Sequence, residues 1–428
     1  MVQPRKRKKI NRRKALRNRS LIVLTLAGII YLSVNACHSS KGAASAEGEK
    51  PEQARARMAP NDTIRRALQQ YLDTHTHPGR LSFAFYDLTA DTMLLSLNKD
   101  SLMPSASCQK LLTFAAAMKN LGAGSRFCSH LYTRGTLRAD TLFGDMVLQT
   151  GFDPLLRADQ FVAFTRAIRR EGIRHVKGKI VLAMSRTDFP EPEDHWKPWD
   201  LVRHKYGLLY QGRERVMRAW KGAVRAAGVT ARNGQFVYGR APRGAKELTY
   251  LSHPMSESLY YMMQNSSNIN AESMLYPLGH QRNFRAASYR SEGIESLREF
   301  VRESLGRRDS CHAIEDGCGL CYRNRLTASL LVDVMRYIYR RPVLYNELLQ
   351  GLPVAGVSGT LRREMVRSKA RGRLQAKTGT LTNPYGVSTL TGYLTARDGR
   401  RYAFSIMCSE TPVADARQLQ ERLCRQFF

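Results

Sequence analysis

A nearly continuous apolar run follows residue 110 and predicts a buried helix. Residues 111–118 read LLTFAAAM, which is apolar almost all round. Pro104 and the small residues after it predict a loop that enters the helix at its N-terminus. Ser107 and Lys110 are three residues apart and would share one face of that helix. A serine beside a buried, neutral lysine is a candidate nucleophile with its base, although the spacing alone is also that of an ordinary helix start.

Alternation of apolar and polar residues predicts strands towards both ends of the chain body. Residues 81–98 form two such runs around a polar turn at 89–91, and runs on either side of 397–400 form a hairpin. Between them, helical periodicity predicts helices, including 158–171, 212–227, 256–264 and 327–338. We therefore expect an α/β protein of the α+β kind, with an antiparallel sheet built from both termini and flanked by helices.

The N-terminal pattern is that of an export signal. Ten basic residues precede an uncharged apolar run at 20–34, which is shorter than the roughly 20 residues of a comfortable membrane span. The run ends in Val-Asn-Ala-Cys at 34–37, which resembles a bacterial lipoprotein signal, so residues 1–37 predict export with lipidation of Cys37. An uncleaved membrane anchor is the alternative. Residues 38–60 are small and charged, and predict a flexible tether.

Charge and localisation exclude some classes of protein. The formal net charge is +32, which alone would permit nucleic-acid binding. The apolar core of an export signal directly follows the basic run, which argues against nucleic-acid binding. It predicts that the body lies in the cell envelope, in the periplasm and on a membrane. We therefore expect no nucleic-acid partner.

Cysteine-rich and polar clusters offer further candidate chemistry. Cys311, His312, Cys318 and Cys321 faintly suggest a zinc cluster. Cys108 rivals Ser107 as a nucleophile, but one residue is about 100° of helix rotation, so it would face away from Lys110.

A polar stretch, Asn-Ser-Ser-Asn at 265–268, separates two apolar helical segments. It predicts either a capping turn or the lining of a site.

Three short motifs stand in order along the chain: Ser107-x-x-Lys110, Ser266-x-Asn268 and Lys377-Thr378-Gly379. This trio is found in penicillin-binding proteins and class A β-lactamases. The sequence resembles a penicillin-binding protein over about residues 62–428, and more narrowly the D-alanyl-D-alanine carboxypeptidase/endopeptidase family S13 of low-molecular-mass class C type. The family's Asp-Gly-Ser-Gly-Leu-Ser loop appears at 316–321 with cysteine in place of both serines, which argues for thiols at serine positions and against zinc.

The resemblance implies a DD-peptidase/β-lactamase-like transpeptidase fold with a smaller inserted domain. The penicillin-binding domain would comprise residues 61–132 and 250–428. Residues 133–249 would be the insert, shortened relative to the larger family members.

The resemblance also implies acyl transfer on peptidoglycan stem peptides ending in D-Ala-D-Ala, with β-lactams as inhibitors and without metal or cofactor. Its implied machinery consists of a nucleophile, its base, a proton relay, an amide holder and a carboxylate-binding strand: Ser107, Lys110, Ser266, Asn268, and Lys377 with Thr378, Gly379 and Thr380. Backbone N–H groups of Ser107 and Thr380 would form the oxyanion hole. Burial beside the second cation, Lys377, would lower the pKa of Lys110.

Two alternatives remain from the sequence. A serine β-lactamase would share the acylation step, but we find no glutamate signature for water activation between the first two motifs. A non-catalytic cell-wall-binding protein is disfavoured because all three motifs are intact.

Overall fold

Two β-sheets organise the chain, and the computed structural model describes residues 59–428 apart from 78, 186–206, 242, 308–310 and 383–385. The first sheet has five antiparallel strands in the order β2-β1-β11-β10-β9. Its strands are β1 (Arg80–Asp87), β2 (Thr92–Leu97), β9 (Leu374–Leu381), β10 (Val387–Thr395) and β11 (Arg401–Ser409). Because β1 pairs with β11 along its whole length, the predicted sheet built from both ends of the chain is confirmed.

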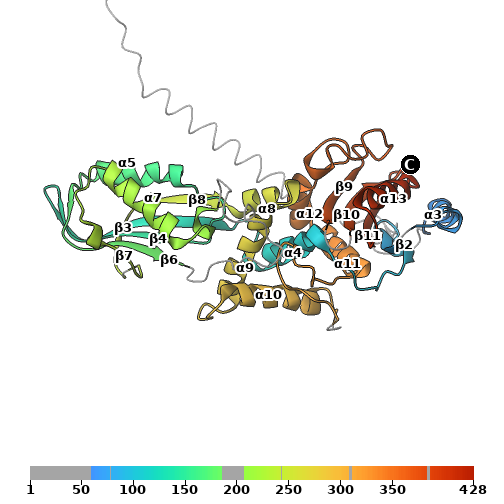
Figure 1. Cartoon of the computed structure of the whole chain (residues 1–428), viewed down its shortest axis with the longest axis horizontal. Helices are drawn as coiled ribbons and strands as arrows, with labels where there is room; N and C mark the ends of the chain where they lie inside the picture. The colour runs from blue at the N-terminus through green and yellow to red at the C-terminus, as the bar shows by residue number, and fades with distance from the viewer. Residues whose placement is uncertain (1–58, 78, 186–206, 242, 308–310, 383–385) are drawn as a thin grey trace, which may run out of the picture. The chain divides into compact units, whose positions relative to one another are not determined.

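Helices cover both faces of this sheet, as Figure 1 shows. One face packs in a single hydrophobic cluster against helices drawn from the middle of the chain, with the buried Leu111–Met118 run at its centre. These helices are α4 (Gln109–Leu121), α8 (Met255–Gln264), α9 (Asn268–Arg282), α10 (Tyr289–Glu299), α11 (Ala328–Tyr339) and α12 (Pro342–Gly351). The opposite face packs against α3 (Asp62–Thr74) and α13 (Val413–Arg425), so the flanked-sheet prediction is confirmed.

The second sheet has the order β7-β6-β4-β3-β8 and a core of its own. Its strands are β3 (Arg126–Arg138), β4 (Thr141–Thr150), β5 (His175–Val176), β6 (Ile180–Met184), β7 (Phe236–Tyr238) and β8 (Lys246–Pro254). The pairs β4–β5, β4–β6 and β6–β7 are parallel. Helices α5 (Val162–Arg170) and α7 (Arg213–Ala226) pack on one face of this sheet (Figure 1).

The predicted domain boundaries fall inside elements of this second sheet. Residue 133 lies within β3, and residue 250 lies within β8. The two strands pair antiparallel, with Arg126 opposite Pro254 at one end and Thr133 opposite Lys246 at the other. The division into domains stays a prediction, but any boundary drawn at these positions cuts two paired strands.

The predicted export signal and Cys37 lie outside the described residues. Within the described ranges, no helix combines the length and the apolar character that crossing a membrane requires.

Candidate active site

Ser107 lies in a 3-10 turn, Ala106–Cys108, that leads directly into α4. The turn begins at Ala106, whose φ of 43° is in the left-handed region that L residues rarely adopt. This conformation presents the hydroxyl of Ser107 to the amine of Lys110, which donates a hydrogen bond over 2.9 Å. The face-sharing predicted from the spacing is therefore present.

The amine of Lys110 is fully buried and held by acceptors from three parts of the chain. Besides Ser107 Oγ, it donates to Asn268 Oδ1 over 2.8 Å and to the carbonyl oxygen of Cys318 over 2.7 Å. Burial lowers the pKa of Lys110, and the neighbouring Cys318, Asp316 and Glu272 oppose that shift.

Lys377 is the second buried amine of the site. It donates to Ser266 Oγ over 2.8 Å and to the carbonyl oxygen of Thr378 over 2.8 Å. Burial, followed by repulsion from Lys110, lowers the pKa of Lys377 to about 7. Burial is the main cause of the lowered pKa of Lys110, and the repulsion between the two buried amines acts in the same direction.

The turn between α8 and α9 supplies Ser266 and Asn268. Ser266 has a φ of 54°, and Ser267 is the N-cap of α9, its side chain accepting from the backbone N–H of Asn270. The cap places Ser266 just before the helix and Asn268 at its first residue. The polar cluster is therefore both a capping turn and a lining of the site.

Strand β9 brings the third motif against the turn that carries Ser107. A Cβ at Gly379 would lie 2.1 Å from Thr389 Oγ1 and 2.9 Å from the Ser107 nitrogen, so only glycine allows this approach. Thr378 Oγ1 lies 2.7 Å from Thr360 Oγ1. Residues of all three motifs line one pocket of about 240 Å³: Ser107, Ser266, Thr378, Gly379 and Thr380.

The loop at 316–321 is locked behind Lys110 by two buried carboxylates. Glu272, on α9, accepts from the backbone N–H of Gly317 over 2.6 Å. Asp316 accepts from the N–H groups of Gly319 over 2.6 Å and Cys321 over 2.7 Å. These bonds fix the position of the Cys318 carbonyl oxygen, which accepts a hydrogen bond from the Lys110 amine.

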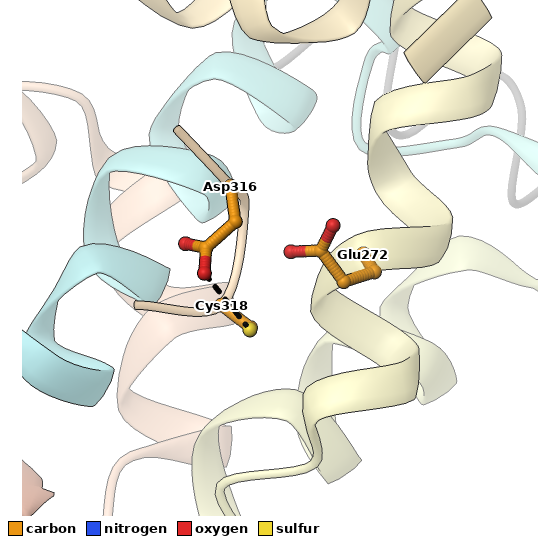
Figure 2. Close-up of side chains that lie close together, drawn as sticks. All are labelled: Glu272, Asp316 and Cys318. Carbon is orange, nitrogen blue, oxygen red and sulfur yellow. Dashed lines mark hydrogen bonds between the residues drawn. The ribbon is translucent and has the colours of Figure 1, made fainter. Parts of the chain in front are cut away.

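Figure 2 shows Glu272, on α9, pointing toward Asp316 and Cys318 of this loop. Their ligand atoms lie within 4.8 Å of one another, a spacing that a metal ion could bridge. The carboxylate oxygens of Glu272 and Asp316 already accept hydrogen bonds from backbone N–H groups. Asp316 Oδ2 also accepts from the Cys318 thiol, 3.6 Å away. Burial and the nearby carboxylates raise the pKa of the Cys318 thiol well above its usual value, so the thiol keeps its proton and can donate to Asp316. The arrangement fits a loop clamp, in which the Cys318 thiol donates to Asp316. That Cys318 stands at a serine position of the family stays a prediction.

A serine that opens onto a pocket and contacts a buried lysine, with a second buried lysine on the edge strand of an antiparallel sheet, is the arrangement of a serine hydrolase of the penicillin-binding class. The chain belongs to the D-Ala-D-Ala carboxypeptidase 3 (S13) family, whose model matches residues 66–206 and 211–425. The family predicted from the three motifs is thereby confirmed.

Individual relatives agree with this assignment. The D-alanyl-D-alanine carboxypeptidase DacB of Haemophilus influenzae is 22% identical over 408 residues, covering 76% of this chain and 84% of that protein. The penicillin-sensitive carboxypeptidase A of Dictyostelium discoideum is 32% identical over 152 residues, 35% of this chain and only 28% of that protein. The crystal structure of penicillin binding protein 4 from H. influenzae superposes with a TM-score of 0.70 at 18% identity, covering 83% of this chain and 99% of that one. This likeness confirms the predicted fold.

Sequence reasoning missed the parts of the site that support Lys110. The glycine loop at 316–321 was recognised as a family loop, but nothing in it predicts that a backbone carbonyl accepts from the amine. Glu272 was detectable in principle, since it lies four residues after Asn268 and therefore on the same face of α9.

Proposed function

We propose that this protein is a serine-type D-Ala-D-Ala carboxypeptidase/endopeptidase that cleaves peptidoglycan stem peptides through an acyl-enzyme. The observation that carries the proposal is the 2.9 Å contact between the buried Lys110 amine and Ser107 Oγ at the opening of the pocket. A neutral amine has two N–H donors, which suit Asn268 and the Cys318 carbonyl, and one lone pair, which then accepts from the Ser107 hydroxyl. A lysine with a lowered pKa is a competent base near neutral pH, whereas an ordinary lysine, with a pKa near 10.4, is not.

In the first step Lys110 takes the proton of Ser107 as its oxygen attacks the carbonyl carbon of the penultimate D-Ala. Backbone N–H groups of Ser107 and Thr380 stabilise the resulting oxyanion, a contribution of about 3–4 kcal/mol per donor in other acyl-transfer enzymes. The C–N bond then breaks, and Ser266, hydrogen-bonded to Lys377, relays to the leaving amine the proton that Lys110 took from Ser107. Water hydrolyses the acyl-enzyme and regenerates Ser107.

Recognition of the substrate falls to the same three motifs. Asn268 holds the substrate amide while its side chain stays oriented by Lys110. Lys377, Thr378, Gly379 and Thr380 supply the strand edge and the donors for the terminal carboxylate. No cofactor takes part in these steps.

β-Lactams would acylate Ser107 as substrate mimics and leave slowly. The test is mass spectrometry of the protein after treatment with benzylpenicillin, with peptide mapping of the adduct. We expect a stable penicilloyl group on the peptide containing Ser107. Absence of any adduct, or an adduct elsewhere, would contradict the mechanism, and rapid turnover of a chromogenic cephalosporin would point to a β-lactamase instead.

We further propose that the protein works in the cell envelope, tethered to a membrane through lipid on Cys37. The support is the basic and apolar pattern of the first 37 residues. Metabolic labelling with a radioactive fatty acid should mark the wild-type chain and not Cys37→Ala. Labelling of both, or of neither, would contradict lipidation at this residue.

A further inference from the structure

The pocket beside Ser107 continues past the third motif to the C-terminal helix α13. Thr378 and Thr380 are opposite Leu390 and Ser388 in the β9–β10 ladder, and paired residues share a face of the sheet. Leu390 packs in the same cluster as Ala416 and Leu423 of α13. The two threonine hydroxyls therefore lie on the side of the sheet that α13 covers.

Arg417, on α13, brings a cation to this end of the pocket. Its Nη2 lies 3.4 Å from Thr380 Oγ1, and its Nη1 donates to Glu364 Oε1 over 2.9 Å. Its side chain is 44% exposed, so the guanidinium remains accessible to a ligand. Glu364 accepts from Nη1 of the Arg417 guanidinium, which leaves Nη2 directed at Thr380.

Gln420 adds a donor to the same wall of the pocket. It is three residues after Arg417 and so lies on the same side of α13, and it is only 3% exposed. Its Nε2 has no hydrogen-bond partner among the residues that the structure describes. A buried donor without an acceptor is unfavourable, so a ligand that supplies an acceptor here is favoured.

We propose that Arg417 and Gln420 determine specificity by binding the terminal carboxylate of the substrate together with the hydroxyls of Thr378 and Thr380. This inference rests on the proposed function. A guanidinium fork beside hydroxyl and amide donors matches the two oxygens of a carboxylate.

The other charges around the pocket make the cation necessary. Glu364 and Glu421 also line it, and both would repel a substrate carboxylate. Arg417 is paired with Glu364 and faces the threonines, so it offsets this repulsion where the ligand would lie. Its removal therefore uncovers two acidic side chains as well as deleting a donor.

The experiment compares two substrates that differ only in this group. One is a synthetic peptide ending in D-Ala-D-Ala with a free carboxylate, and the other is its C-terminal methyl ester. Cleavage of the final peptide bond is followed for wild type, Arg417→Ala, Arg417→Lys, Gln420→Ala and the control Arg422→Ala, which removes an exposed arginine of the same helix. Thermal unfolding establishes that each variant is folded.

We expect wild type and Arg422→Ala to prefer the free acid. Arg417→Ala should lose about 10-fold to 100-fold in kcat/KM on the acid, mainly through KM, and change little on the ester. Arg417→Lys and Gln420→Ala should fall between these limits. Equal losses on acid and ester, or no loss in Arg417→Ala, would overturn the inference while leaving the carboxypeptidase intact. A wild-type protein that cleaves neither peptide and is not acylated by penicillin would overturn the proposed function itself, and the inference with it.

Discussion

The sulfur of Cys108 lies 3.2 Å from the hydroxyl of Thr389, on the side of the turn that faces β10. Its thiol also donates to the carbonyl oxygen of Lys377 over 3.2 Å, and burial raises its pKa. Cys108 is therefore a packing residue next to the proposed nucleophile, as its angular position on the turn predicted.

Substituting Ser107 and Cys108 one at a time distinguishes the nucleophile from the packing residue. Ser107→Ala should abolish covalent labelling by a fluorescent penicillin, because no other hydroxyl receives a hydrogen bond from Lys110 among the described residues. Cys108→Ala should retain labelling and lose about 1–2 kcal/mol of unfolding free energy through a small cavity. Gel fluorescence and urea unfolding measure the two effects. The reverse labelling pattern would make the thiol the nucleophile.

The pH dependence of acylation follows from the lowered pKa of Lys110. Lys110 accepts the proton of Ser107 only when it is neutral, so the acylation rate should rise with pH as the amine loses its proton. Because burial moves this pKa downward, the rise should be largely complete well below the ordinary value near 10.4. Stopped-flow labelling between pH 5 and pH 9 tests this, and a rate still climbing tenfold per pH unit at pH 9 would contradict it.

Lys377→Met should stabilise the protein while destroying its activity. The folded state releases the Lys377 proton near pH 7, whereas an unfolded lysine keeps it to about pH 10.4. The wild-type protein therefore gains stability as pH rises from 7 towards 10, and burying the charge costs most below pH 7. We expect the variant to exceed wild type by about 1–3 kcal/mol at pH 6 and by less at pH 9.

Urea unfolding at the two pH values measures this difference. Lys369→Met, at an exposed position, is the control and should stay within about 0.5 kcal/mol of wild type. A Lys377→Met protein less stable than wild type at pH 6 would show that its bonds to Ser266 and Thr378 outweigh desolvation.

Gly319→Ala should disrupt both the loop and the site. Gly319 has a φ of 81°, and a Cβ there would lie 1.8 Å from the carbonyl oxygen of Ala106, next to Ser107. We expect a loss of about 2–4 kcal/mol in unfolding free energy and slower penicillin acylation. Gly306→Ala is the matched control, since its φ is also positive, at 66°, but no atom of the described residues lies within 4 Å of the added carbon. It should cost about 1 kcal/mol and leave acylation unchanged; equal effects of the two substitutions would rule out the close contact as the cause.

Periodicity along the sequence was sufficient for the main elements. The alternation around Asp-Gly at 398–399 and the apolar run at 111–118 correctly predicted the β10–β11 hairpin and the buried part of α4. The parallel pairing of β4 with β6 was not predicted, because a parallel ladder joins segments through a crossover and leaves no local turn signal. The predicted boundaries at 133 and 250 lie inside β3 and β8. These strands pair across more than a hundred residues, and pairing over that separation also leaves no local signal in the sequence.

The sequence by itself determined the family, through three short motifs, and it placed Ser107 and Lys110 on one face of a helix. Only the tertiary structure decided the environment of the two amines. The carbonyl of Cys318, the carboxylates behind it and the repulsion between Lys110 and Lys377 arise from segments far apart in the chain. The reason is physical: side-chain spacing is fixed by backbone geometry within a few residues, whereas burial and pKa depend on everything that packs around a group.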